Sequence, residues 1–417
     1  MAGKTRLFHW TSMLRTILFL APTGQLGGAE RCLVDTLWSF QQDRPEIQKV
    51  LITGSDGLLV KAAENEKTKV LIHPFPRLFS RLGDSGLGRS KLKLILLIIK
   101  MIIAFPAMVL YLMKLRNIIR REQPAIVHVL GLKMQILSLL AVPRRMKIIW
   151  NVQDYIGQRR MVRTILKIAL KTVGRGRDIA AGCCSDDVCR DLAEVLPGNA
   201  IRQIETIYNT VDFNTFRPDG EIIPELSAKT FIKIGLIATY ARWKGHDLFI
   251  EALAKLNQIP ALPDWHGFII GGPIYATAGS QWSKSELQLM ADEKGIGQKM
   301  TFLDFQANPA AAMRGLDILV HASTKPEPFG RVIAEGQACG CVVVAVESGG
   351  SGEVFENEIS GIGFQMGNAK SLADALQLLL NHPEKRRSIR QNLIDQPDRK
   401  FDRRLLYSKW IQLYDFK

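Results

Sequence analysis

One stretch decides the fold of this chain: Glu327-Pro-Phe-Gly-Arg-Val-Ile-Ala-Glu335-Gly336. The apolar run at residues 316–320 predicts a buried strand that leads into a Pro-Phe-Gly turn, and the apolar residues after the turn predict a helix that begins near Phe329. The free backbone N–H groups and positive dipole end of such a helix favour an anion in the turn. Glu327 precedes the helix and Glu335 lies within it, so both carboxylates can hold hydroxyl groups beside that anion. A nucleotide-sugar, with sugar on both sides of a phosphate, is a ligand of this kind.

The same stretch resembles the E-x7-E signature of the retaining GT-B glycosyltransferases of group 1, the GT4 family. The glutamate spacing alone is weak, but the longer string, continued by Gly349-Gly-Ser-Gly-Glu353, is specific. Residues 209–218 also resemble the family stretch that precedes the crossover into the second domain. The resemblance covers nearly the whole chain, most specifically residues 205–365. It implies the GT-B fold, an α/β architecture of two Rossmann-like domains that face each other across a cleft. The alternative is a surface turn followed by a helix with a solvated glutamate.

Strand and helix signals alternate along the chain, which is typical of an α/β protein with parallel sheets. Strands are predicted at residues 16–20, 49–53, 70–73, 125–130, 147–152, 183–185 and 205–208, and then at 231–238, 266–271, 300–303, 318–321 and 341–345. A Pro- and charge-rich stretch at residues 216–229 indicates a boundary. We predict an N-terminal acceptor-side domain over residues 1–215, a nucleotide-sugar-binding domain over residues 216–400, and a helix over residues 401–417 that returns to the first domain.

The net charge of +15 lies entirely in the first half of the chain. Residues 1–215 hold 32 Lys and Arg against 17 Asp and Glu, whereas residues 216–417 hold 23 of each. This excess points to an anionic partner of the first half. Anionic lipid head groups or a diphosphate-linked acceptor fit, since each base near a membrane surface contributes about 1 kcal/mol. Nucleic acid fits less well, because the chain has no recognition helix and no basic strand interleaved with aromatic residues.

An apolar segment with basic flanks occupies residues 91–121. The twenty residues between Lys93 and Lys114 are interrupted only by Lys100 and Pro106. This length can span a bilayer, but the segment lies between two strands of one predicted sheet, which spanning would separate. We expect a helix that packs one face on the sheet and presents the other to a membrane surface. A buried helix, or a helical hairpin broken near Pro106, is the alternative.

A second basic segment follows at residues 144–177. It holds ten Lys and Arg and a single acid, Asp154. This ratio is too lopsided for an ordinary salt-bridged face. Together with residues 91–121 it predicts a peripheral association with an anionic membrane.

The resemblance assigns Lys244 and Arg242 to a cationic clamp on the donor phosphates, with Glu327 as the third catalytic residue. Lys244 matches the family pattern well. The family's arginine lies five residues before the lysine, where this chain has Thr239, so Arg242 would supply its charge from a different turn. The alternative for Lys244 is a loop lysine at a helix start, where a cation is unfavourable against the helix dipole.

The resemblance further implies that Glu335 binds the ribose hydroxyls and that Glu327 binds hydroxyls of the transferred sugar. The backbone N–H groups expected to face the sugar and diphosphate are those of Phe329, Gly330 and Arg331. Gly27 and Gly28, in a strand-to-helix turn, resemble the first-domain glycine motif that approaches the donor from across the cleft. Gly271 ends a predicted strand, where it either lines the nucleotide pocket or forms a plain tight turn.

The acceptor side departs from the family pattern. Many relatives have a histidine two residues after the position of His128, where this chain has Leu130, and many have His-Asp where this chain has Gln153-Asp154. No strong candidate for a protein base emerges, which a retaining enzyme tolerates because a leaving phosphate oxygen can accept the acceptor's proton. We assign the acceptor side to His128, for which a structural role is the more frequent alternative, and to Asp154.

These observations predict a retaining glycosyltransferase that moves a sugar from a nucleoside-diphosphate sugar to a saccharide or lipid-linked acceptor in envelope polysaccharide or glycolipid synthesis. The six cysteines form no metal-ligand pattern and are expected to be reduced, buried thiols of a cytoplasmic protein at the inner face of the membrane. No metal, cofactor or nucleic-acid partner is expected. The alternatives are a nucleotide-sugar epimerase on the same fold and a non-catalytic binding protein.

Overall fold

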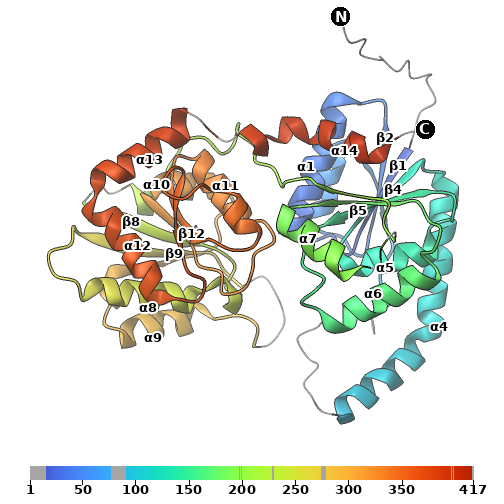
Figure 1. The fold of residues 1–417 in the computed structure, drawn as a ribbon, viewed down its shortest axis with the longest axis horizontal. Helices are drawn as coiled ribbons and strands as arrows, with labels where there is room; N and C mark the ends of the chain where they lie inside the picture. Colours follow the sequence, from blue (N-terminus) through green and yellow to red (C-terminus); the bar gives the residue numbers. More distant parts are fainter. Residues whose placement is uncertain are drawn as a thin grey trace, which may run out of the picture.

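The protein consists of two α/β domains that lie side by side and are joined by two crossing segments (Figure 1). The computed structural model describes residues 16–76, 91–196, 198, 200–227, 230–273, 279–395, 397 and 399–415. Side chains are described for all of these except residues 91–104 and 399. Each domain is built on one parallel sheet, as the alternation of strand and helix signals predicts.

The N-terminal domain has a seven-stranded parallel sheet of order β3-β2-β1-β4-β5-β6-β7. Its strands are β1 (Thr16–Ala21), β2 (Gln48–Thr53), β3 (Lys69–Ile72), β4 (Ile126–Leu130), β5 (Lys147–Val152), β6 (Ile179–Cys183) and β7 (Gln203–Thr206). The central strands are buried on both faces, as is usual for a parallel sheet covered by helices. In β1, Leu18 pairs in register with Val50 and Val127.

Two layers of helices cover this sheet. The helices are α1 (Gly28–Asp43), α2 (Leu58–Asn65), α4 (Lys91–Glu122), α5 (Leu132–Ala141), α6 (Arg160–Thr172) and α7 (Asp186–Val195). Alternate residues of a strand face opposite sides, so Leu18 packs with the apolar faces of α4, α5 and α6, whereas Phe19 packs with α1. One apolar cluster continues from the first of these layers into the second domain.

The C-terminal domain has a six-stranded parallel sheet of order β10-β9-β8-β11-β12-β13. Its strands are β8 (Ile232–Ile237), β9 (Trp265–Ile270), β10 (Met300–Leu303), β11 (Ile318–His321), β12 (Val342–Val346) and β13 (Gly361–Phe364). Its helices are α8 (His246–Asn257), α9 (Lys284–Glu293), α10 (Pro309–Gly315), α11 (Arg331–Ala338), α12 (Ala369–Asn381) and α13 (Pro383–Asp395). The carboxyl ends of β8 and β11 carry the segments that build the site described below.

The last helix, α14 (Leu406–Tyr414), lies on the N-terminal domain against α1 and β6 (Figure 1). Two crossing segments run beside each other, and Val211 forms a parallel bridge with Asp402. Trp410 and Tyr414 are fully buried. The N-terminal domain therefore completes its core with residues from the far end of the chain.

The predicted parallel α/β fold is confirmed, but some element positions differ from the prediction. The strand predicted at residues 183–185 is β6, which ends at Cys183, because Ser185 instead caps α7 by accepting from the Val188 N–H. The strand predicted at residues 205–208 begins at Gln203 and ends at Thr206. Strand β13 was not predicted, because its short sequence, Gly-Ile-Gly-Phe, carries little strand signal.

The long helix α4 is continuous through Pro106, so the hairpin alternative is wrong. Its C-terminal part buries Tyr111, Leu115 and Ile119 against the sheet and leaves Phe105 and Met113 exposed, so this part is not the fully buried helix of the other alternative. The predicted one-sided packing is present there, while side chains of residues 91–104 lie outside the description. No helix in the described ranges combines the length and hydropathy needed to cross a membrane.

Candidate functional site

The predicted anion-binding turn lies between β11 and α11. The helix begins at Arg331, two residues later than predicted, because Gly330 is its N-cap with a φ of 85°. This left-handed conformation favours glycine. Phe329 is buried, with its ring 5.4 Å from that of Phe401 in the crossing segment. The turn is therefore fixed on one side by the core and opens the first N–H groups of α11 toward the other domain.

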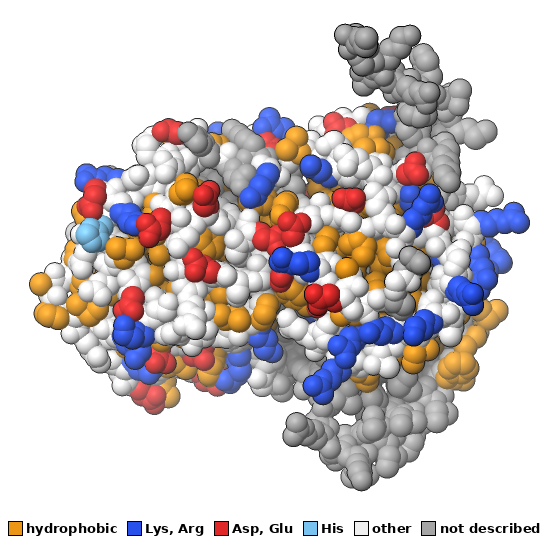
Figure 2. Space-filling view, in the orientation of Figure 1, with side chains coloured by type: hydrophobic (Ala, Val, Ile, Leu, Met, Phe, Trp, Pro, Cys, Tyr) orange, Lys and Arg blue, Asp and Glu red, His pale blue; other side chains and the backbone are white. Residues whose placement is uncertain are grey.

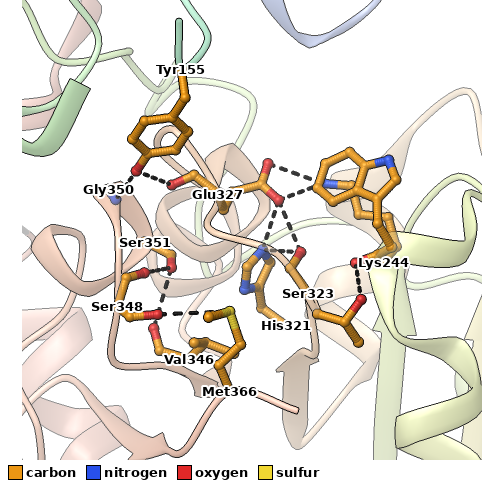
Figure 3. Close-up of polar contacts among 12 residues, drawn as sticks. Tyr155, Lys244, His321, Ser323, Glu327, Val346, Ser348, Gly350, Ser351 and Met366 are labelled. Carbon is orange, nitrogen blue, oxygen red and sulfur yellow. Dashed lines mark hydrogen bonds and ion pairs between the residues drawn. The ribbon is translucent and has the colours of Figure 1, made fainter. Parts of the chain in front are cut away.

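Glu327 is the centre of a polar network at this turn (Figure 3). Its carboxylate accepts from the Lys244 ammonium at 2.8 and 3.0 Å and from the Ser323 hydroxyl at 2.9 Å. Nε2 of His321 lies 3.4 Å from the same carboxylate. Burial raises the pKa of Glu327, but Lys244 and His321 outweigh this and hold the pKa well below its usual range. Glu327 is therefore an ionised acceptor of hydrogen bonds near neutral pH.

A close backbone approach brings Lys244 to Glu327. Lys244 ends a short 3-10 turn and is followed by Gly245, which has a φ of 75°. A Cβ on Gly245 would lie 1.8 Å from the carbonyl oxygen of Ala322, which follows β11. Because glycine has no Cβ, the segments that follow β8 and β11 can approach this closely. Their contact places the Lys244 ammonium beside the Glu327 carboxylate.

Arg242 points away from this network. Its guanidinium stacks 3.6 Å above the Trp282 ring and lies 3.5 Å from the carboxylate of Glu286 in α9. The structure thus brings Lys244 and Glu327 together but leaves Arg242 on the outer side of the turn. The charge that was predicted to come from Arg242 is not at the start of α11.

Another cation, Arg331, does lie at the start of α11. Its Nη1 donates to the Asp35 carboxylate of α1 at 2.9 Å, and its Nε donates to Glu335 at 3.3 Å. Nη1 also lies 3.4 Å from the Cys32 sulfur. Burial raises the pKa of Glu335, an effect that the Arg331 guanidinium opposes. Glu335 is therefore a buried carboxylate at the contact between the two domains, and its partner comes from its own helix.

Gly27 and Gly28 open α1 on the opposite wall of the cleft. Gly27 is the N-cap, and its N–H donates to the Glu30 carboxylate at 3.1 Å. A Cβ on Gly28 would meet nothing within 4 Å, so this side of the turn is open. Because α1 also carries Asp35, which contacts Arg331, the two glycines lie on the helix that faces α11.

Two further contacts join the domains next to Glu327. The Tyr155 hydroxyl donates to Asp187 at 2.6 Å. It also accepts from the Gly350 N–H at 3.1 Å (Figure 3). The Glu353 carboxylate accepts from the N–H groups of Asp186 and Asp187 at 2.8 Å each and so caps α7 from the other domain. The sequence pattern Gly-Gly-Ser-Gly-Glu contained this signal, but its partner helix was not identifiable from the sequence.

The predicted acceptor residues lie in different surroundings. Asp154 pairs with Arg159 at the edge of the cleft, and burial raises its pKa. His128 is fully buried beneath α14, where Nδ1 lies 2.5 Å from the Tyr414 hydroxyl, and burial lowers its pKa to about 3. The acceptor-side assignment of His128 is therefore corrected: the last helix covers this side chain, and it has no access to an acceptor.

Gly271 follows β9, where its conformation, with a φ of 153°, is structural. A Cβ there would lie 1.9 Å from the carbonyl oxygen of Ala238, so the turn requires glycine. Its N–H donates to the carbonyl of Leu303. The geometry supports the tight-turn interpretation. Across the described part of the chain, no three His, Cys, Asp or Glu side chains gather in a way that could hold a metal ion.

The family described as glycosyl transferases group 1 matches residues 221–396. The C-terminal domain belongs to this family. A D-inositol 3-phosphate glycosyltransferase of Mycobacterium avium is 30% identical to this chain over 203 residues, and one of Mycolicibacterium paratuberculosis is 29% identical over the same length. The aligned residues cover 48% of this chain and 46% and 44% of those two proteins, so the chain spans less than half the length of the curated relatives it matches.

Solved structures match both domains of this chain. A crystal structure of Anabaena HepE in complex with UDP and glucose covers 95% of this chain and 98% of its own, with a TM-score of 0.74 and 21% identity. The structure of WaaG, a glycosyltransferase involved in lipopolysaccharide biosynthesis, covers 96% and 98%, with a TM-score of 0.63 and 14% identity. At such identities the likeness speaks for the fold alone, and it confirms the predicted GT-B architecture.

Proposed function

We propose that this protein is a retaining glycosyltransferase that moves a sugar from a nucleoside-diphosphate sugar to a saccharide or lipid-linked acceptor in envelope polysaccharide or glycolipid synthesis. One observation carries the proposal: the Lys244–Glu327 pair lies beside the N-terminus of α11, whose first residue, Arg331, pairs with Asp35 of α1. This arrangement places a cation, an ionised carboxylate and free N–H groups on one wall of the cleft. Membership of the C-terminal domain in group 1 supports the same activity.

In the proposed reaction the acceptor oxygen forms a bond to the anomeric carbon while the bond from that carbon to the diphosphate oxygen breaks. Charge then develops on the leaving diphosphate, and Lys244 and the α11 N–H groups would stabilise it. An oxygen of the leaving phosphate accepts the proton of the acceptor hydroxyl, so no protein base is required. Glu327 would orient the donor sugar by accepting hydrogen bonds from its hydroxyls, because its low pKa keeps it ionised.

The test is mass-spectrometric incubation of the protein with a panel of nucleotide-sugars, first alone and then with saccharide and lipid-linked acceptors. We expect slow hydrolysis or transfer that Glu327→Gln reduces by about two orders of magnitude. Glu356→Gln is the matched control, because Glu356 is exposed in the same domain. Conversion of a nucleotide-sugar to its epimer without an acceptor would contradict the proposal. So would equal turnover by the Glu327→Gln variant.

We also propose that the N-terminal domain rests on the cytoplasmic face of an anionic membrane. Helix α6 exposes Met161, Ile165 and Ile168, which share one face of the helix at spacings of four and three residues. Helix α4 adds exposed Phe105 and Met113. Figure 2 shows Lys and Arg side chains gathered over the region of α6 and α4. Apolar side chains beside bases suit the interface of an anionic bilayer.

The membrane proposal is tested by sedimentation with vesicles of phosphatidylcholine containing phosphatidylglycerol, at low and high salt. We expect the protein in the pellet at low salt, and less of it with phosphatidylcholine alone. Charge reversal of Arg163, Lys167 and Lys171 together should return it to the supernatant. Recovery in the supernatant at both salt concentrations, by the unaltered protein, would reject this part of the proposal without touching the activity.

A further inference from the structure

An ion cluster between the domains joins Arg331 to two carboxylates. The side chains of Arg331, Asp35 and Glu335 are only 15%, 13% and 12% exposed. Arg331 belongs to α11 and Asp35 to α1, so the shorter of the two ion pairs, at 2.9 Å, crosses the cleft. This contact is separate from the Lys244–Glu327 pair, and no pattern along the chain predicts it.

The charges of this cluster do not balance around Arg331. One guanidinium faces two carboxylates, and the effect of Asp35 on Glu335 is to raise its pKa further than burial alone does. Arg31, on α1, acts on Glu335 in the opposite direction but makes no ion pair with it. Two carboxylates that share one buried cation repel each other. The contact between Arg331 and Asp35 is therefore easier to exchange than an isolated buried ion pair, provided that another anion replaces Asp35.

Arg331 is also placed and shaped to bind a diphosphate. It is the first residue of α11, so its backbone N–H and its side chain begin at the same positive helix end. The fork of a guanidinium matches two phosphate oxygens, a geometry that lysine lacks. Its Nε and Nη1 are engaged, whereas Nη2 has no hydrogen-bond partner within the described ranges. Arg242, the other candidate, is held by Trp282 and Glu286.

We propose that Arg331 binds the donor diphosphate through its guanidinium, and that Asp35 competes with the diphosphate for this side chain. The inference rests on the proposed function and extends it to a residue whose side chain had no assigned role. A donor that replaces Asp35 on Arg331 also breaks a contact between α1 and α11. Donor binding is thereby coupled to the interdomain contact.

The proposal is tested by calorimetric titration of the full chain with UDP, GDP and ADP, and with the nucleosides uridine, guanosine and adenosine. Asp35→Asn removes the competing charge. The nucleoside diphosphate that binds the unaltered protein should therefore bind this variant about fivefold more tightly. Arg331→Met should weaken it by about tenfold or more, and Arg331→Lys by less, because the charge remains without the fork. Binding of the matching nucleoside should not change in any of the three variants.

Asp43→Asn is the matched control, since Asp43 lies exposed at the end of α1. Equal or weaker diphosphate binding by Asp35→Asn, with a retained thermal unfolding transition, overturns the competition and leaves the proposed function standing. Unchanged diphosphate binding by Arg331→Lys and Arg331→Met overturns the role of Arg331. Failure of the unaltered protein to bind any diphosphate at millimolar concentration overturns the proposed function together with this inference.

Discussion

The C-terminal domain pairs its charges at the cleft, whereas the N-terminal domain gathers bases on its surface. Lys244, Glu327, Arg331 and Glu335 all lie in ion pairs and are mostly buried. The segment of residues 144–177, which includes α6, holds ten bases against one acid, with apolar side chains exposed beside them. Buried pairs fix the direction of each side chain, which a reaction site requires. A surface excess of one sign attracts a large anionic partner without fixing its orientation.

The largest effect is expected when the Lys244–Glu327 ion pair of the C-terminal domain is removed. Lys244→Met removes the ammonium that donates to both oxygens of the Glu327 carboxylate. We expect transfer to fall by about 100-fold or more, because the leaving diphosphate loses a compensating charge. The measurement is kcat/KM for the donor identified in the nucleotide-sugar screen. Lys370→Met, at an exposed pair, is the control, and a similar rate in both variants would contradict the site.

The next prediction concerns how much α14, near the C-terminus, stabilises the N-terminal domain against unfolding. Trp410 of α14 is fully buried and lies against Gly182 of β6. Trp410→Ala should lower the free energy of unfolding by about 3–5 kcal/mol, because it leaves a large cavity. Urea denaturation followed by circular dichroism measures this loss. A loss below 1 kcal/mol would mean that α14 contributes little to the domain on which it packs.

Each domain contains a buried histidine whose effect on the unfolding free energy at acidic pH can be measured. Burial lowers the pKa of His128 to about 3, and burial together with Lys244 lowers that of His246 to about 4. Both values lie below the usual 6.5, so the contribution of each histidine to stability is complete above pH 6.5 and falls as the pH decreases toward the folded value. Each histidine should add about 1.4 kcal/mol per pH unit to the slope of the unfolding free energy between pH 6 and pH 4.5.

His128→Gln and His246→Gln should each remove one such increment of slope. Urea denaturation at several pH values between 7 and 4.5 measures it, and comparison of slopes cancels any constant loss caused by the substitution itself. An unchanged slope for His128→Gln would show that this side chain becomes protonated within the fold, in conflict with its burial under α14. The same result for His246→Gln alone would confine the disagreement to the C-terminal domain.

The smallest effect is expected for a single base on the surface of α6. Lys167→Gln in α6 should weaken binding to phosphatidylglycerol vesicles by about fivefold at low salt, since one base near an anionic surface contributes about 1 kcal/mol. Co-sedimentation over a range of lipid concentrations measures the change. Lys255→Gln, on the exposed face of the C-terminal domain, is the control. Equal losses in the two variants would mean that net charge, and not the α6 surface, attracts the membrane.

The sequence by itself determined the two parallel α/β domains and the main turn of the site. Strand and helix periodicities are local, so most strand positions were predicted to within two residues, and only β13 was missed. The turn after Glu327 and a helix start within two residues of the observed one were predictable because the turn, the glycine and the apolar helix face lie within ten consecutive residues. Lys244 was assigned from its resemblance to the family's cationic clamp, whereas the close approach of two strand ends at Gly245 is seen only in the structure.

Only the tertiary structure decided which charged groups meet. The partner of Arg331 is Asp35, about three hundred positions away, and the direction of Arg242 depends on the ring of Trp282. His128 looked like a strand-end residue near an acceptor, but the last helix of the chain covers it. Propensity and motif spacing report on neighbours along the chain, whereas ion pairs and burial depend on how distant elements pack. Local sequence patterns therefore predicted the fold. The ion pairs between the domains depend on how the two domains pack, and local patterns do not report this.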